Sequence, residues 1–204
     1  MPAPFTLTLH MVSSLDGFIA KPDNSIGWFE TASDFPEGID PMLAYAQMTK
    51  VDCYIMGSRT YDLAMELSRE HGWPYGDTHT IVLTKRSLPR RSEHIEWYDG
   101  DLPVLLEKLK GEFGNVWLVG GAETARNFLR AGLVNEIRHN ILPILLGGGL
   151  SFYDTLGMEK GLELVSTASQ RQTAVGHEFN KCQLILPHLN KHHFTSTYAW
   201  LLHW

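Results

Sequence analysis

The chain has 204 residues and a formal net charge of −6, with 44% hydrophobic and 20% charged residues. That balance is typical of one ordinary globular domain, and it argues against nucleic-acid binding through broad phosphate neutralisation. The two cysteines, Cys53 and Cys182, lie in apolar runs, so we interpret them as small buried hydrophobes rather than as a disulfide or metal site. No charged leader and no apolar run of ~18 residues is visible, and we expect a cytoplasmic protein.

The amino-terminal half is predicted to begin with a strand over residues 5–12, which ends at the turn Asp16-Gly17. Residues 26–41 mix glycine, proline, acidic and aromatic residues and predict a long structured loop, a kind that is often functional. The elements expected next are a short helix over 41–50, a strand over 51–56, a helix over 61–70, strands over 79–84 and 95–98, and a helix over 101–110.

The clearest unit of the sequence is a strand over 115–119, the turn Gly120-Gly121 and a helix over 122–131. Strands are then expected over 136–143, 162–168 and 177–186, and the glycines of 147–149 predict a tight turn. This alternation favours a mostly parallel α/β sheet with an antiparallel carboxyl-terminal edge, in one domain over 1–187. Residues 188–204 are rich in histidine and aromatics and predict a separate tail: a partner-binding segment, an appended helix or a terminus unrelated to the fold.

The turn Gly120-Gly121 can serve a phosphate, because glycine admits close approach and the following helix presents backbone N–H groups and a positive end. A tight turn without a ligand explains the same pattern equally well. Two other strand ends carry groups that suit a phosphate, namely Gly57, Ser58, Arg59 and Thr60 after one strand and Thr84, Lys85 and Arg86 after the next. Ser58 and Thr60 can alternatively cap a helix.

In a parallel sheet the carboxyl ends of the strands meet at one edge, where ligands bind. We therefore expect these three strand ends to converge on one phosphorylated nucleotide. Their cations would suit a dinucleotide that carries an additional 2′-phosphate.

The segments SLDGFIA, YIMGSRTY, IVLTKR, VWLVGGAET and AGLVNEIRHNILPILLGGGLSFYD occur in this order. Together they resemble stand-alone members of the dihydrofolate reductase-like superfamily that are related to the riboflavin-biosynthesis reductase (RibD C-terminal) domain. The resemblance covers residues 5–186. It implies a three-layer α/β fold, with a mostly parallel central sheet, helices on both faces and an antiparallel carboxyl-terminal edge.

The resemblance also implies an NADPH-dependent reductase of a small pterin- or pyrimidine-like heterocycle, and a homodimer. The implied cofactor contacts are Ala20 at the nicotinamide, Gly57, Ser58, Arg59 and Thr60 at the adenosine phosphates, Thr84, Lys85 and Arg86 at the 2′-phosphate, and Val119, Gly120, Gly121, Ala122, Glu123 and Thr124 at the pyrophosphate. It further implies a cis peptide between the paired glycines. Val119 stands where riboflavin-pathway reductases typically have an acidic residue that contacts substrate, which argues against their substrate.

A reduction also needs a proton at the acceptor atom, and a carboxyl group can provide it. Asp34 is the first candidate because it follows Trp28 and Phe29 in the long loop, Asp16 is the second and Glu37 the third, although a turn explains Asp16 and a helix start explains Glu37. Trp28, Phe29 and Phe35 are candidates for a wall that stacks on a flat substrate, or else for packing in the core. We expect no metal centre. The alternatives are a nucleotide-binding protein without turnover and an oligomeric binding protein.

Overall fold

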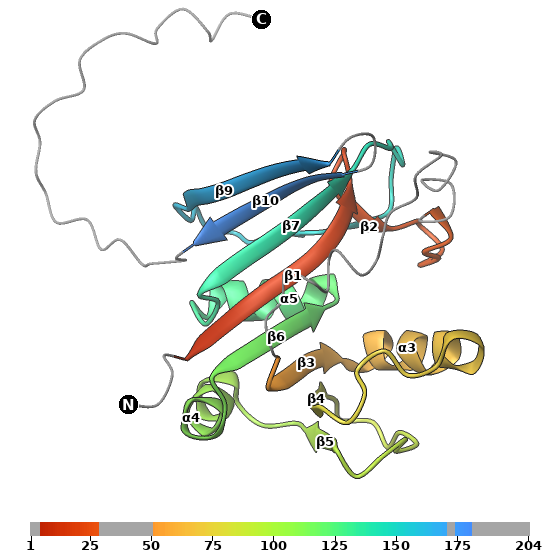
Figure 1. Cartoon of the computed structure of the whole chain (residues 1–204), viewed down its shortest axis with the longest axis vertical. Coiled ribbons are helices and arrows are strands. Elements are labelled where there is room, and N and C mark those ends of the chain that lie inside the picture. Colours follow the sequence, from red (N-terminus) through yellow and green to blue (C-terminus); the bar gives the residue numbers. More distant parts are fainter. Residues whose placement is uncertain (1–4, 29–50, 171–173, 181–204) are drawn as a thin grey trace, which may run out of the picture.

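The computed structural model describes residues 5–28, 51–170 and 174–180. Eight strands form one sheet in the order β5-β4-β3-β6-β1-β7-β10-β9, and β2 pairs with β8 in a small second sheet (Figure 1). The strands are β1 (Thr6–Ser14), β2 (Phe18–Ala20), β3 (Cys53–Gly57), β4 (His79–Leu83), β5 (Ile95–Tyr98), β6 (Asn115–Gly120), β7 (Glu136–Leu142), β8 (Leu150–Ser151), β9 (Glu163–Gln170) and β10 (Ala174–Asn180). The described helices are α3 (Ser58–His71), α4 (Leu102–Glu112) and α5 (Ala122–Arg130).

In the series β5-β4-β3-β6-β1-β7 every pair of neighbouring strands is parallel, whereas β10 pairs antiparallel with both β7 and β9. The mostly parallel sheet with an antiparallel carboxyl-terminal edge is therefore confirmed. Strand β1 lies between β6 and β7, so the amino-terminal segment occupies the centre of the sheet (Figure 1).

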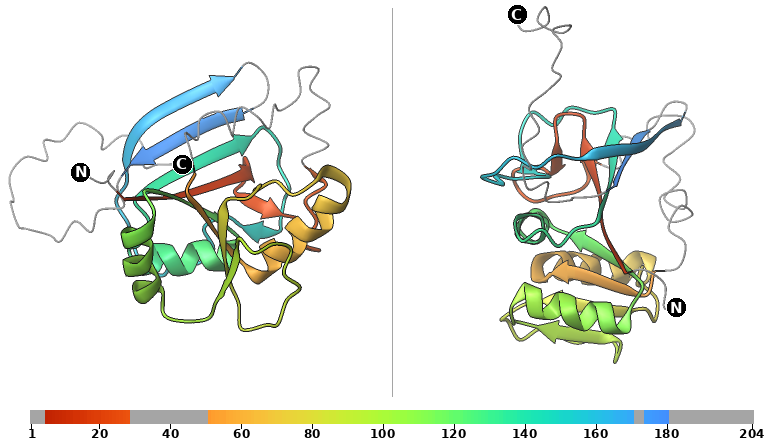
Figure 2. Two further views of the ribbon diagram at one scale, coloured as in Figure 1. Left: turned by 60° about the horizontal axis from the view of Figure 1, so that its bottom comes forward. Right: turned by 90° about the vertical axis from the view of Figure 1, so that its left-hand side faces the viewer.

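Helices cover both faces of the sheet, because alternate residues of each strand point to opposite sides. Leu7 and Leu9 of β1 pack in one buried cluster with Leu105 of α4 and Phe128 of α5. A second cluster, which includes Tyr61 of α3, lies against strand residues that alternate with the first set. The predicted three-layer arrangement is confirmed, and the layers can be followed in the two views of Figure 2.

Most predicted elements are present, with bounds that differ by a few residues. Helix α3 begins at Ser58 rather than at residue 61, and neither α3 nor α5 receives a side-chain hydrogen bond at its N-cap, which is a glycine in each case. The expectation that Ser58 or Thr60 caps this helix is therefore wrong, since both residues already lie within its first turn. The predicted helix over 41–50, Cys182 and the tail over 188–204 lie outside the described residues.

Cys53 is fully buried on β3, and burial raises the pKa of its thiol to about 12. It is thus a core side chain, as the sequence predicted. Among the helices that the structure describes, none has the length and apolar character to cross a membrane.

A partly exposed ionic network links α4 to the sheet at the amino ends of β4 and β5. The Glu96 carboxylate accepts hydrogen bonds from Lys108 Nζ at 2.6 Å and from the His79 ring at 3.1 Å. Burial by itself raises the pKa of Glu96, but the hydrogen bonds and charges of Lys108 and His79 outweigh it, so the pKa lies below its ordinary value. Glu96 therefore stabilises the fold in its ionised form.

We predict that Glu96→Gln lowers the free energy of unfolding at pH 7 by about 1 kcal/mol, because a partly exposed charge pair contributes little more than that. A carboxylate with a lowered pKa stabilises the fold above its unfolded-state pKa and loses the effect as the pH falls through the folded-state pKa. The difference between Glu96→Gln and wild type in urea unfolding should accordingly shrink below pH 4.5, the ordinary pKa of the group. Glu107→Gln, in an exposed pair with Lys110, is the control and should change little. A deficit that stays constant down to pH 3 would contradict the ionic origin.

Candidate nucleotide-binding site

Three strand ends meet at the carboxyl edge of the sheet. The parallel strands β4, β3 and β6 are consecutive neighbours, with Gly57 beside Leu83 in one pairing and Met56 beside Gly120 in the other. The structure thus brings together the three segments that the sequence predicted to converge. Helices α3 and α5 both start at this edge, directly after β3 and β6 (Figure 1).

The two helix starts are packed directly against each other. A Cβ atom placed on Gly57 would lie 2.6 Å from Thr124 Oγ1, which is closer than such atoms approach, and one on Gly121 would lie 3.5 Å from Thr60 Oγ1. Glycine at position 57 is therefore required for the first turns of α3 and α5 to approach this closely. The peptide between Gly120 and Gly121 is cis, as the resemblance implied.

The backbone amides at these two helix starts suit an anion. The first N–H groups of a helix have no partner within the helix, and the helix dipole gives that end a partial positive charge. Because the N-caps Gly57 and Gly121 offer no side-chain oxygen, no side-chain cap competes for these amides. The arrangement fits the phosphates of a nucleotide. The carboxylate of Glu123, in the first turn of α5, has the same sign as a phosphate and would act against its binding.

The cations near this edge differ in their surroundings. Arg59 is exposed on the first turn of α3, and Lys85 is exposed just after β4. The Arg86 guanidinium instead donates a 2.8 Å hydrogen bond to the Asp62 carboxylate of α3. The Thr84 hydroxyl accepts a hydrogen bond from the Arg86 backbone N–H and so shapes the turn. Arg59 and Lys85 are thus better placed than Arg86 to receive a further phosphate.

The side chain of Asp16 links the turn after β1 to the loop that begins at Leu146. Its carboxylate accepts hydrogen bonds from the Ser14 hydroxyl at 2.6 Å and from the backbone N–H groups of Leu146 and Gly147 at 3.1 and 2.7 Å. The Ser14 hydrogen bond, together with these amides, lowers the pKa of Asp16 although desolvation opposes it. An ionised carboxylate has no proton to give, so the structure favours the turn interpretation of Asp16 over a role as proton donor.

The loop of residues 147–149 and the strand β8 after it pack against residues 17–20. A Cβ on Gly149 would overlap the carbonyl oxygen of Ala20, the Phe152 N–H donates to the Gly17 carbonyl at 2.8 Å, and β8 pairs with β2. The loop therefore positions residues 17–20 by backbone contacts. This agrees with the sequence interpretation of a tight turn rather than a phosphate cradle.

Trp28 is fully buried and packs against Leu142, with Val12, Ile144 and Leu146 around them. A ring without an exposed face cannot stack on a substrate, so the structure favours the core interpretation of Trp28. Phe29, Asp34, Phe35 and Glu37 lie outside the described residues.

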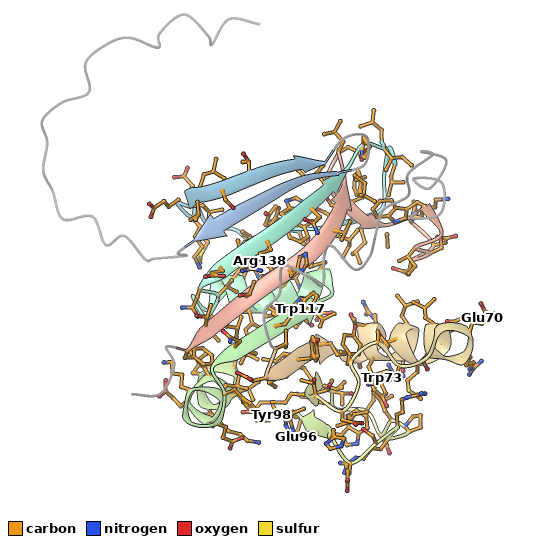
Figure 3. The ribbon with its side chains drawn as sticks, viewed as in Figure 1. Glu70, Trp73, Glu96, Tyr98, Trp117 and Arg138 are labelled. Atoms are coloured by element: carbon orange, nitrogen blue, oxygen red, sulfur yellow. The ribbon has the colours of Figure 1, made fainter. Side chains whose placement is uncertain are left out.

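Sequence reasoning missed two buried histidines on neighbouring central strands. His10 is 7% exposed, its ring stacks on Trp117 with centroids 4.8 Å apart, and its Nε2 lies 3.0 Å from the Asn140 amide nitrogen. Burial, and secondarily the charges of Arg138 and His139, lower the pKa of His10 to about 4, so its ring is neutral. Figure 3 labels Trp117 of β6 and Arg138 of β7, the two strands that flank β1. The available signal was a histidine in the middle of a strand pattern in which apolar residues alternate with threonines.

Comparison with protein families gives a match between residues 5–175 and the model of the RibD C-terminal domain. Two proteins of Bacillus subtilis (strain 168), whose names assign no function, are similar along most of their length. YwjB is 31% identical over 170 residues, which are 83% of this chain and 94% of YwjB. YyaP is 24% identical over 171 residues, covering 79% of this chain and 87% of YyaP.

Among solved structures, a putative riboflavin biosynthesis protein from Shewanella sp. PV-4 superposes with a TM-score of 0.73 at 25% identity, covering 86% of this chain and 98% of that one. A deaminase/5-amino-6-(5-phosphoribosylamino)uracil reductase from Thermotoga maritima gives 0.63 at 15% identity, with 88% of this chain and 57% of that chain covered. Dihydrofolate reductase from Enterococcus faecalis, complexed with NADP(H), gives 0.60 at 14%, with coverages of 86% and 95%. The latter two likenesses establish the shared fold.

We predict that Gly57→Ala lowers the free energy of unfolding by about 1–3 kcal/mol, because the added methyl group overpacks the contact with Thr124. Urea unfolding measures the change. Introducing Gly57→Ala into a Thr124→Ala background should recover part of the loss, since the opposing oxygen is then absent. Gly111→Ala on α4, where an added Cβ meets nothing within 4 Å, is the control. An equal loss in both backgrounds would refute the proposed contact.

Proposed function

The chain belongs to the RibD C-terminal domain family, and on this basis we propose that it is an NADPH-dependent reductase of a small flat heterocycle. The observation that carries the proposal is the pair of closely packed glycine turns at which α3 and α5 begin without side-chain caps. The two helices that start at this edge present their first backbone amides and the positive ends of their dipoles to a phosphate chain. The glycines at the two N-caps have no Cβ that would block its approach.

In the proposed complex, the amides of Gly121, Ala122, Glu123 and Thr124 bind the pyrophosphate, and Val119 and Gly120 form the floor beside it. Gly57, Ser58, Arg59 and Thr60 bind the adenosine phosphates. Arg59 and Lys85 hold the 2′-phosphate, while Thr84 and Arg86 shape the turn that presents Lys85. Residues 17–20, ending in Ala20, cover the nicotinamide.

The cofactor, when bound, supplies the hydride, and the chain supplies orientation and the proton. Asp34 remains our first candidate for the proton donor and Glu37 the second, because Asp16 is held as an anion by three donors. For the substrate we propose a pterin- or pyrimidine-like ring that stacks on Phe29. Trp28, which packs in the core, would hold the chain next to Phe29 in place. The apolar Val119 supports a substrate other than the phosphoribosylamino-pyrimidine.

We predict that NADPH quenches tryptophan fluorescence at micromolar concentration and binds more tightly than NADH. Arg59→Ala and Lys85→Ala should each raise the Kd for NADPH about tenfold, the effect of one lost charge-assisted hydrogen bond, and should leave the Kd for NADH nearly unchanged. Lys110→Ala, at the opposite end of the strands, is the matched control. Equal losses for the two cofactors would refute the 2′-phosphate assignment, and absence of binding by wild type would refute the cofactor. Binding without turnover of any pterin or pyrimidine would identify a nucleotide-binding protein.

We also propose that the chain forms a homodimer through the edge of the sheet. β9 is the last strand of the described sheet, and its apolar residues Leu164 and Val165 are 55% and 48% exposed. Within the part of the chain that the structure describes, no strand pairs with the outer side of β9, and an edge with exposed apolar side chains favours association with another chain. A second copy offers the same edge and can satisfy it symmetrically.

We predict that Leu164→Lys shifts the chain from dimer toward monomer in light scattering, because the charge must be desolvated at the interface. Leu67→Lys, which replaces a leucine of 41% exposure on α3, is the control and should leave the mass unchanged. A wild-type chain of monomer mass at 100 μM, or an unchanged dimer in Leu164→Lys, would count against this edge.

A further inference from the structure

His139 of β7 is a buried polar ring whose two nitrogens both meet hydroxyl groups. The residue is 7% exposed, and its ring stacks on Phe152 at a centroid distance of 4.3 Å and an interplanar angle of 19°. Its Nε2 lies 2.7 Å from Ser13 Oγ, and its Nδ1 lies 3.4 Å from the Tyr153 hydroxyl. Packing alone does not require this pattern, since an apolar side chain fills such a position at lower desolvation cost.

The partners fix the direction of the hydrogen bonds. Ser13 Oγ donates to the Ser14 carbonyl at 2.8 Å, so it can only accept from His139, which places the proton on Nε2. Nδ1 then carries a lone pair and accepts from Tyr153. Burial raises the pKa of Tyr153 to about 12, so its hydroxyl keeps its proton and remains a donor. The result is a one-directional chain from Tyr153 through His139 and Ser13 to the backbone of Ser14.

This chain leads into the turn that follows β1. The Ser14 hydroxyl accepts the Phe18 N–H at 3.0 Å and donates to Asp16, whose carboxylate binds the amides of Leu146 and Gly147. At the other end of the network, Tyr153 directly follows Phe152, whose N–H donates to the Gly17 carbonyl. Both ends of the network are thus connected to residues 14–20.

The network lies on the same face of the sheet as the glycine turn. Ser13 follows Met11 on the same side of β1, since strand residues alternate. An added Cβ on Gly120 would meet Met11 Sδ at 3.1 Å, so Met11 packs against the glycine turn on the same face of β1 as Ser13.

We propose that His139 is a positioning residue, which holds residues 14–20 in place over the nicotinamide through Ser13 on one side and Tyr153 on the other. The proposal rests on the proposed function for what the segment covers. The positioning itself rests on the hydrogen bonds and on the stacking with Phe152. His139 contributes through the tautomer that its two hydroxyl partners select, and it does not contact the cofactor.

The test removes hydrogen bonds of the network and keeps the packing. Tyr153→Phe removes a single oxygen. Ser13→Ala removes the acceptor together with its bond to the Ser14 carbonyl, and His139→Phe retains the stacking on Phe152 without either histidine bond. His139→Gln retains a donor toward Ser13 and should recover part of the effect. Thr80→Val is the matched control, because it removes another fully buried hydroxyl, at the amino end of β4.

Two measurements separate positioning from general stability. Hydrogen exchange of the backbone amides at residues 14–20 and 146–152 should accelerate in Tyr153→Phe and Ser13→Ala, and the amides of α4 should keep wild-type rates. The Kd for NADPH should rise roughly fivefold, as expected for one lost hydrogen bond. The Kd for adenosine 2′,5′-bisphosphate, which has no nicotinamide, should stay the same.

Uniform acceleration of exchange, including α4, would overturn the proposal, as would the same exchange change in Thr80→Val. Equal losses of NADPH and of the bisphosphate would also overturn it, because the effect would then not be specific to the nicotinamide segment. If wild type binds neither ligand, the proposed function fails, while the exchange measurement still decides whether His139 holds residues 14–20.

Discussion

The close contact between the first turns of α3 and α5 is the constraint on which the rest of the structure depends. It requires β3 and β6 to be adjacent and parallel, because only then do both helices start at one edge. It also requires glycine at position 57, where a Cβ would meet Thr124 Oγ1. With glycine as N-cap of both helices, the first amides have no side-chain oxygen to satisfy them. The glycine that permits the packing thus also leaves the first amides of α3 without a side-chain cap.

Features that local patterns encode could be predicted from the sequence, and long-range side-chain pairings could not. Buried apolar runs indicated the strands, and the glycines at the ends of two of them indicated the convergence at Gly57 and Gly120, because those signals are local. Asp16 finds its amide partners 130 and 131 residues away, and His139 finds Ser13 at a separation of 126. No local pattern encodes such pairs. The sequence left Trp28 open between a stacking wall and packing in the core, because an aromatic residue type alone does not distinguish a core ring from a ligand platform.

Strand β1 contributes differently to each face of the sheet. Leu7, Leu9 and Met11 pack under α4 and α5, and Ser13 continues that face with a hydroxyl. His10, on the other face, stacks on Trp117 as a neutral ring. His10 is the middle residue of the strand, and Ser13 lies toward its carboxyl end, nearer the glycine turns. Polar groups buried in a sheet centre are costly, so these two fit a region whose geometry must be specified as well as filled.

The acidic net charge of the chain limits where affinity for a phosphate can come from. In a chain with a net charge of −6, overall attraction does not draw in a polyanion, so phosphate affinity must arise from local dipoles and a few cations. The Arg86–Asp62 pair neutralises one of those cations and at the same time holds the turn after β4 against α3. Arg59, on the first turn of α3, and Lys85, within the turn after β4, remain exposed. Discrimination for a 2′-phosphate would therefore depend on two side chains, whereas the pyrophosphate would depend on backbone amides that no single substitution removes.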